Sequence, residues 1–149
     1  MKKTLDFKVV FNDNDPTAFY DALKFTDRNF GLAFSDPSAN QRLNISQTRN
    51  GGANWINCKN CKDFPYLEKG EAAFAASNTN IASFRNVIWI ATGGAKSRIY
   101  RMKNKDCNWQ VFETPFTQGT SSQGIYSIDF FDKNFGIAVG GDYTKQSDN

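Results

Sequence analysis

Histidine is absent from this sequence of 149 residues, and its absence removes several kinds of catalytic site. Neither a Ser-His-Asp triad nor a Cys-His pair can form, and no zinc ion can be held by imidazole nitrogens. Acid–base chemistry would have to use Asp, Glu, Tyr, Lys or Cys instead. The composition therefore favours a protein that binds over one that catalyses, and we assign no catalytic residue.

Cysteine is scarce, with only Cys58, Cys61 and Cys107 in the chain. Cys58 and Cys61 have the C-x-x-C spacing that occurs in redox and zinc sites. A redox motif of this kind lies at a strand-to-helix junction, whereas this one follows a strand-like segment and precedes a loop that contains proline. A zinc site would need a fourth ligand, which neither cysteine nor histidine can supply. We expect incidental thiols or a local disulfide and no cofactor, with metal binding and redox catalysis as alternatives.

Long apolar runs and clusters of one charge are also missing. No run approaches the ~20 residues that a membrane span needs. The 18 Lys and Arg residues exceed the 15 Asp and Glu residues only slightly and stand singly or in pairs, unlike the footprint of a nucleic-acid-binding surface. Met1–Lys3 resembles the start of a signal peptide, but Asp6 and Lys8 interrupt the apolar stretch that should follow. We therefore expect no membrane span, no nucleic-acid partner and no signal peptide in this chain.

Aromatic residues are plentiful, at 15% of the chain, which rules out a disordered protein. Short alternations of apolar and polar residues are separated by turn residues, and this pattern indicates an all-β fold. Tyr20–Phe25 and Phe30–Phe34 are predicted to be the two strands of a hairpin. Arg42–Ser46 and Trp55–Cys58 are predicted to flank a tight turn at Asn50–Gly52, where glycine supplies the positive φ that the turn requires.

An internal repeat is the strongest pattern in the sequence. Tyr20–Ser35 and Tyr126–Gly141 both read as a strand, an Asp-x-Asn-Phe-Gly turn and a second strand of small residues. A more diverged copy opens at Glu71–Ser77 and continues with Val87–Gly94 as its second strand. A repeating unit of four short strands is typical of a β-propeller blade.

The predicted strands group into blades, but into too few blades to close a propeller. Residues 5–15 hold the last strand of a preceding blade, residues 17–60 and 71–115 each form a blade, and residues 124–149 form half a blade. A propeller needs at least about four blades, and an open array leaves apolar faces and strand edges exposed. We therefore expect an all-β, incomplete β-propeller of about two and a half four-stranded antiparallel blades. It would be a fragment, a truncated copy or a chain that closes by assembly.

The chain resembles the BNR/Asp-box β-propellers related to photosystem II stability and assembly factors, over roughly residues 9–143. The Asp box of that family, Ser/Thr-x-Asp-x-Gly-x-x-Trp, is similar to Thr48–Trp55, with Asn50 in place of the aspartate. A degenerate second copy is Arg101–Trp109, with Asn104 in that place. Further segments that resemble one subgroup of the family are Phe19–Asp21, Gly31–Pro37, Gly70–Ser77, Trp89–Gly94, Ser122–Ser127 and Gly136–Tyr143.

The boxes predict structural residues, because an Asx side chain accepts backbone N–H groups, glycine takes the positive φ and tryptophan packs on the hairpin. These residues are Thr48, Asn50, Gly51, Trp55, Asn104 and Trp109. Inner propeller strands line the channel in which ligands usually bind, so polar residues at small-residue strands are candidate ligand- or partner-binding residues. They are Asp21, Asp36, Glu71, Arg98, Tyr126, Asp142 and Tyr143. Each has a structural alternative as a turn acceptor, an ion-pair partner or a loop anchor.

The resemblance and the missing catalytic residues predict a non-catalytic module that binds a protein or a polar ligand. One alternative is a sialidase-like glycoside hydrolase whose remaining catalytic residues lie in missing blades, although no arginine cluster is recognisable. A second alternative is a structural propeller fragment without a function of its own. The expected partner is an unidentified protein, and self-association would complete the propeller. The resemblance also implies that the full-length protein is exported or periplasmic.

Overall fold

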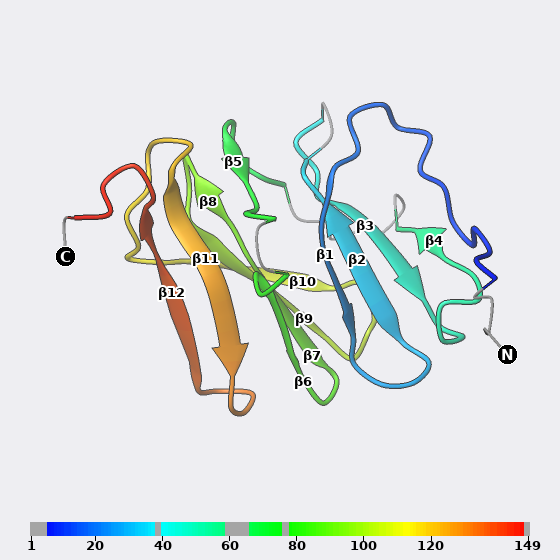
Figure 1. The fold of residues 1–149 in the computed structure, drawn as a ribbon. Coiled ribbons are helices and arrows are strands. Elements are labelled where there is room, and N and C mark those ends of the chain that lie inside the picture. Colours follow the sequence, from blue (N-terminus) through cyan, green and yellow to red (C-terminus); the bar gives the residue numbers. More distant parts are fainter. Residues whose placement is uncertain (1–5, 38–39, 59–65, 76–77, 148–149) are drawn as a thin grey trace, which may run out of the picture.

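The computed structural model describes residues 6–37, 40–58, 66–75 and 78–147. All regular secondary structure in these residues is β-strand, arranged as three antiparallel sheets of four strands each. Figure 1 shows the sheets side by side, with the first on the right and the third on the left. The predicted all-β class is therefore confirmed.

The first sheet is a meander of four consecutive strands. Its strands are β1 (Tyr20–Phe25), β2 (Gly31–Ser35), β3 (Asn44–Thr48) and β4 (Ile56–Asn57), in that spatial order. In the turn between β3 and β4, Gly51 and Gly52 have φ angles of 70° and 90°, which a side chain would strain. The two predicted hairpins of this region are present.

The second sheet lies in the middle of the molecule and is also a meander, apart from one short strand. Its strands are β6 (Ile81–Phe84), β7 (Val87–Ala91), β9 (Arg98–Lys103) and β10 (Trp109–Glu113), in the order β10-β9-β7-β6. Arg85, in the two-residue turn between β6 and β7, has a φ of 53°, as tight hairpin turns demand.

The third sheet combines a long hairpin with two strands of two residues. It consists of β5 (Glu71–Ala72), β8 (Gly93–Gly94), β11 (Gln123–Phe130) and β12 (Gly136–Asp142), in the order β12-β11-β8-β5. β8 approaches β11 so closely that a Cβ on Gly93 would lie 2.7 Å from the carbonyl oxygen of Gln123. Glycine is therefore required in β8, which lies between two strands of the middle sheet in the sequence but pairs with β11 of the third sheet.

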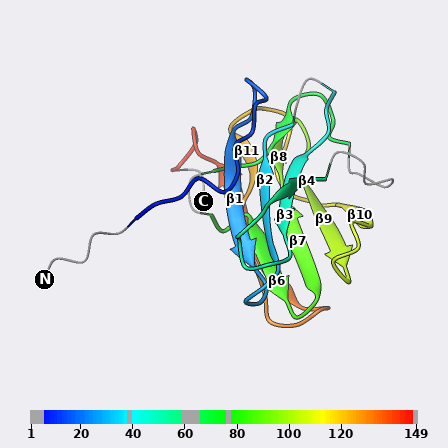
Figure 2. The same ribbon diagram turned by 90° about the vertical axis from the view of Figure 1, so that its right-hand side faces the viewer.

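Two strand predictions are wrong. Residues 6–19 lie in no strand, so the strand predicted at Leu5–Phe11 is not found in its described part. In Figure 2 the first described residues of the blue N-terminal segment run away from the sheets, and Phe7 and Val9 are largely exposed. The segment meets the first sheet at Phe11, which packs edge-on against Tyr20 with ring centroids 6.3 Å apart. Of the strand predicted to open the second blade at Glu71–Ser77, the described residues 71–75 form only β5, which joins the third sheet. The second sheet begins instead at β6, because there the chain pairs with β7 over four residues.

The hairpins β1–β2 and β11–β12 are two copies of one unit. In the turn of the first hairpin, the Asp27 carboxylate accepts the N–H groups of residues 29 and 30, at 2.8 and 2.9 Å. Asp132 accepts the N–H groups of residues 134 and 135 in the same way, at 2.6 and 2.8 Å. Each hairpin also has one bulge, at Asp21 in β1 and at Tyr126 in β11. The shared turn and bulge fix the equivalence residue by residue.

The second sheet is buried on both faces, as the strand β7 shows. Ile88 and Ile90 belong to the core between the first and second sheets. Val87, Trp89 and Ala91 alternate with them and belong to the core between the second and third sheets. Successive side chains of a strand point to opposite faces, so an unbroken apolar run is what two cores require.

The first sheet turns one particular face to the middle sheet. Leu32 and Phe34 lie in the shared core and are at most 1% exposed; we call this the front face. Leu23 pairs with Ala33 across the hairpin and lies on the opposite face, which we call the back face. The back face has no sheet over it among the described residues, and Leu23 is 44% exposed.

The third sheet turns the other face to the middle sheet. Ile128 and Ala138, the equivalents of the back-face residues of the first sheet, pack in the second core. Ile137 and Val139, the equivalents of the front-face residues, are 64% and 56% exposed. The sheets therefore stack head to tail, front against back, with β6 next to both β1 and β11.

Candidate functional site

The seven residues predicted to bind a ligand or partner do not form one site. They lie in three places, which are an ion-pair network between the second and third sheets, the end of the β11–β12 hairpin, and the free edge of β1. The three groups differ in how much of their hydrogen-bonding capacity is used within the chain.

Glu71 and Arg98 form a buried ion pair that joins β5 to β9. The Nε atom of Arg98 lies 3.1 Å from both carboxylate oxygens of Glu71, and its Nη2 atom also bonds this carboxylate. Oε1 of Glu71 accepts further hydrogen bonds from the hydroxyls of Thr92 (2.6 Å) and Tyr100 (2.8 Å). Burial, together with the negative charge of Glu71, raises the pKa of Tyr100, which keeps this phenol a donor. Every charged group of the network is satisfied, so it ties two sheets together and leaves little for a ligand.

The residues at the end of the third sheet are also used within the chain. The Tyr126 hydroxyl lies 2.7 Å from the carbonyl oxygens of both Ser122 and Gly141. Asp142 accepts hydrogen bonds from the hydroxyl and the N–H of Thr144, at 2.7 and 3.0 Å, and these bonds lower its pKa. Tyr143 is half exposed and lies near Tyr126, with ring centroids 6.4 Å apart.

Asp21 differs from the other candidates because its carboxylate is buried without a partner. It occupies the bulge of β1 and is 5% exposed, and neither side-chain oxygen has a hydrogen-bond partner in the described structure. Burial, followed by the negative charge of Asp36, raises the pKa of Asp21 to about 7. Asp36 accepts the N–H of Ala73 at 3.2 Å, and burial raises its pKa too. Burying a carboxylate without a hydrogen-bond or ion-pair partner destabilises the folded state. Of the three places, this edge would therefore gain most from binding a cation.

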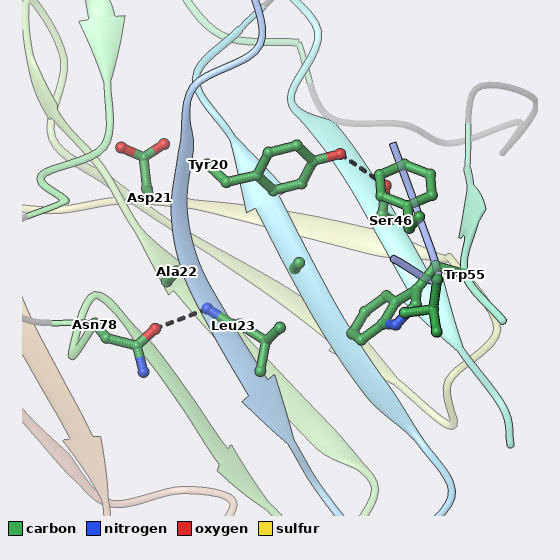
Figure 3. A pocket seen from close by; sticks show the side chains of 10 residues that line it. Tyr20, Asp21, Ala22, Leu23, Ser46, Trp55 and Asn78 are labelled. Carbon is green, nitrogen blue, oxygen red and sulfur yellow. Dashed lines mark hydrogen bonds between the residues drawn. The ribbon is translucent and has the colours of Figure 1, made fainter. Parts of the chain in front are cut away.

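A hollow of about 450 Å³ lies on the back face of the first sheet and reaches this edge. Figure 3 shows the Tyr20 and Trp55 rings over the sheet, while Asp21 and Asn78 lie beyond the free edge of β1. The hydroxyls of Tyr20 and Ser46 are 2.9 Å apart, and Asn78 accepts the N–H of Leu23 at 2.7 Å. Most of the remaining lining is apolar, so the hollow suits an apolar group better than a charged one.

The Asp-box residues of the first sheet form a local turn. The Asn50 side-chain oxygen accepts the N–H of Asn54 at 2.9 Å and the Thr48 hydroxyl at 3.0 Å. Trp55 packs edge-on against Phe25, with ring centroids 5.9 Å apart. In the corresponding turn of the second sheet, Asn104 has a positive φ of 58°, as Gly51 does in the first sheet. Trp109 lies in the core between the two sheets.

Sequence reasoning missed three residues of these places. Thr92 and Tyr100 complete the Glu71 network, and Phe74 packs edge-on against Tyr126 with ring centroids 4.8 Å apart. The role of Tyr100 could have been suspected from the sequence. It lies in the middle of a strand with alternating polarity, and a buried tyrosine hydroxyl usually has a hydrogen-bond partner.

Two of the three cysteines, Cys58 and Cys107, lie in the described part of the chain. The Sγ atoms of Cys58 and Cys107 lie 3.9 Å apart, across the first and second sheets. Cys61, and with it the predicted local disulfide, lies outside the described residues. Within the described part of the chain, no group of three or more Cys, Asp or Glu side chains is placed to hold a metal ion. That part also contains no helix that could cross a membrane.

Comparison with known proteins gives no relative for this chain. No protein-family model matches the sequence. No curated protein and no solved structure matches it either.

Proposed function

We propose that this chain is a non-catalytic binding module of the β-propeller kind, which recognises a protein through the back face of its first sheet. The propeller assignment is supported by the head-to-tail stacking of four-stranded antiparallel sheets, with β6 beside β1 and β11. In a propeller the first strands of neighbouring blades adjoin in this way around the central axis.

The observation that carries the binding function is the hollow on the back face. Its apolar lining includes Val10, Phe11, Leu23, Ala33 and Trp55. An apolar hollow with a few polar groups at its edge is the usual form of a binding site. Trp55 is partly exposed in this lining, and partly exposed aromatic residues are typical of the residues that dominate binding energy.

Asp21 adds a preference for a basic group at the edge of the bound segment. Its carboxylate gains most from a cation, because burial leaves it without a partner and Asp36 adds a second negative charge nearby. We therefore expect the recognised protein to present apolar side chains to the hollow and a Lys or Arg at the free edge of β1.

Glycoside hydrolysis is less well supported than binding. A sialidase-like mechanism would need the Tyr126 hydroxyl as a nucleophile, but this hydroxyl is held by main-chain carbonyl oxygens of its own hairpin. Of the seven candidate residues, the one arginine is bound to Glu71. The Tyr126 hydroxyl and the Arg98 guanidinium both make their hydrogen bonds within the chain.

Selection of peptides from a random display library tests the proposed function. The intact chain is the target, and the Leu23→Glu variant, which places a charge on the exposed back face, is used for counter-selection. We expect the recovered peptides to be apolar with one basic residue and to bind the variant at least about tenfold more weakly. Asp21→Asn should reduce the preference for the basic residue. Peptides that bind both chains equally, or no enrichment, would contradict the proposal.

A further inference from the structure

Among the described residues, no sheet covers the front face of the third sheet or the back face of the first sheet, and these are unlike faces of one repeated unit. The N-terminal segment reaches the back face at Phe11, which packs edge-on against Tyr20 beside the hollow. We propose that these two faces bind each other between two copies of this chain, so that the third sheet of one copy stacks on the first sheet of the next. This inference names the partner of the back face and therefore rests on the proposed function.

The open front face would be buried if a sheet covered it. Phe135, Ile137 and Val139 are 60%, 64% and 56% exposed. Their equivalents in the first sheet, Phe30, Leu32 and Phe34, are at most 3% exposed because the second sheet covers them. The same positions are apolar in both units, so the third sheet carries a surface made for a neighbouring sheet.

In the described part of the chain, no strand pairs with the sheet edge next to this face either. β2 pairs with β3 along its whole length, but its equivalent β12 is the outermost strand of its sheet. A seven-residue strand with an unpaired edge and an apolar face is a site at which other β-structure associates.

The open back face lacks the neighbour that its equivalent has. In the third sheet, the back-face ring of Phe130 is stacked on Trp89 of the second sheet, with ring centroids 3.9 Å apart. Phe25 is the equivalent residue of the first sheet and is 40% exposed. The hollow beside it is the space that a side chain of a neighbouring front face would enter.

These observations favour a second copy of the chain as the partner. Its first sheet offers the kind of back face against which front faces pack within the chain. Front-to-back contacts of this kind are made twice within the chain, so the proposed contact continues an existing series of interfaces. Contacts between unlike faces are heterologous and generate either a closed ring or an open chain of copies.

Sedimentation of two complementary variants tests this arrangement. Ile137→Glu blocks the front face, Leu23→Glu blocks the back face, and both residues are exposed, so the fold should persist. Wild-type protein should sediment as an assembly, and each variant alone as a monomer at the same concentration. A mixture of the two variants should form a 1:1 dimer, because one intact front face still meets one intact back face. Val111→Glu, at a position that is 43% exposed on the outer strand of the second sheet, is the matched control and should assemble like wild type.

Three results would overturn the inference. They are a wild-type chain that stays monomeric at all concentrations, a single variant that still assembles, and a mixture that does not recover the dimer, which would indicate contacts between like faces. Val139→Glu and Phe25→Glu repeat the test if a first variant loses its β-sheet circular dichroism. A monomeric wild type that still selects peptides would remove the second copy as partner and leave the proposed function standing.

Discussion

The hairpins β1–β2 and β11–β12 share a turn, a bulge and a strand register, yet they bury opposite faces. Leu32 in the first is 1% exposed, whereas its equivalent Ile137 is 64% exposed. The difference arises from position in the stack, because the first hairpin has the second sheet in front of it and the last hairpin has it behind.

This comparison separates local structure from burial. The Asp-x-Asn-Phe-Gly turn forms in both hairpins because the aspartate accepts two N–H groups of its own turn, whatever lies outside. Burial depends on which sheet comes next. The exposure of Ile137 therefore indicates a front face that no described sheet covers, and not a local fold different from that around Leu32.

The largest effect is expected where the third sheet is attached. Arg98→Ala leaves the Glu71 carboxylate buried without its cation, and this should cost roughly 3–5 kcal/mol of unfolding free energy. Lys96→Ala is the control, because the ion pair of Lys96 with Glu113 is exposed and should contribute less than ~1 kcal/mol. Urea denaturation measures both values. Equal losses in the two variants would contradict the role assigned to the buried network.

Equivalent core and surface positions should respond very differently to the same truncation. Leu32→Ala opens a cavity in a packed core and should cost about 2–5 kcal/mol. Ile137→Ala removes side-chain atoms that are mostly in water in a single copy and should cost less than ~1 kcal/mol under dilute conditions. Chemical denaturation at low protein concentration measures the pair. Similar losses at both positions would mean that the front face of the third sheet is covered within one copy.

The bulge position carries Asp21 in one hairpin and Tyr126 in the other, and of the two it is the aspartate that makes stability depend on pH in the acidic to neutral range. Its folded pKa of about 7 lies above its ordinary value of 3.8, so the unfolded chain loses the proton first as pH rises. This contribution to stability is therefore present below pH ~4 and is lost between pH ~4 and ~7. Asp21→Asn should be more stable than wild type by roughly 1–3 kcal/mol at pH 8 and nearly equal at pH 4. A difference that is independent of pH would contradict this.

The smallest effects are expected at the two turns. Asp27→Ala and Asp132→Ala each remove the acceptor of two backbone N–H groups, so both should lower the melting temperature slightly. Asp27 also pairs with Lys105 of the second sheet, and this pairing lowers the pKa of Asp27. The Asp27 variant should therefore lose slightly more in low salt than in high salt, and the Asp132 variant should show no such difference. Calorimetry at two salt concentrations measures this.

The parts of the fold that depend on residues close together in the sequence could be predicted from it. The bounds of β1 and the position of both Asp-x-Asn-Phe-Gly turns follow from alternation and turn chemistry. The exchange of β5 and β8 into the third sheet could not be predicted, because strands of two residues have no periodicity. Leu5–Phe11 alternates like a strand, but no partner strand lies beside it in the described structure.

The candidate residues were recognised more easily than their roles. Glu71 and Arg98 stood out as charged residues near strands, but their pairing depends on how the second and third sheets stack. The isolation of Asp21 depends on a bulge that turns its side chain to the free edge of β1. The openness of Ile137 became visible only by comparison with Leu32, since the two positions look alike in the sequence.

Hydrogen exchange at increasing protein concentration tests the head-to-tail account most directly. Segments 20–26 and 131–140 carry the open back and front faces, and segment 109–113 is an outer strand away from both. The account predicts that the first two segments gain protection together as concentration rises, while the third does not change. Protection of only one of the two open faces, or of neither, would contradict it.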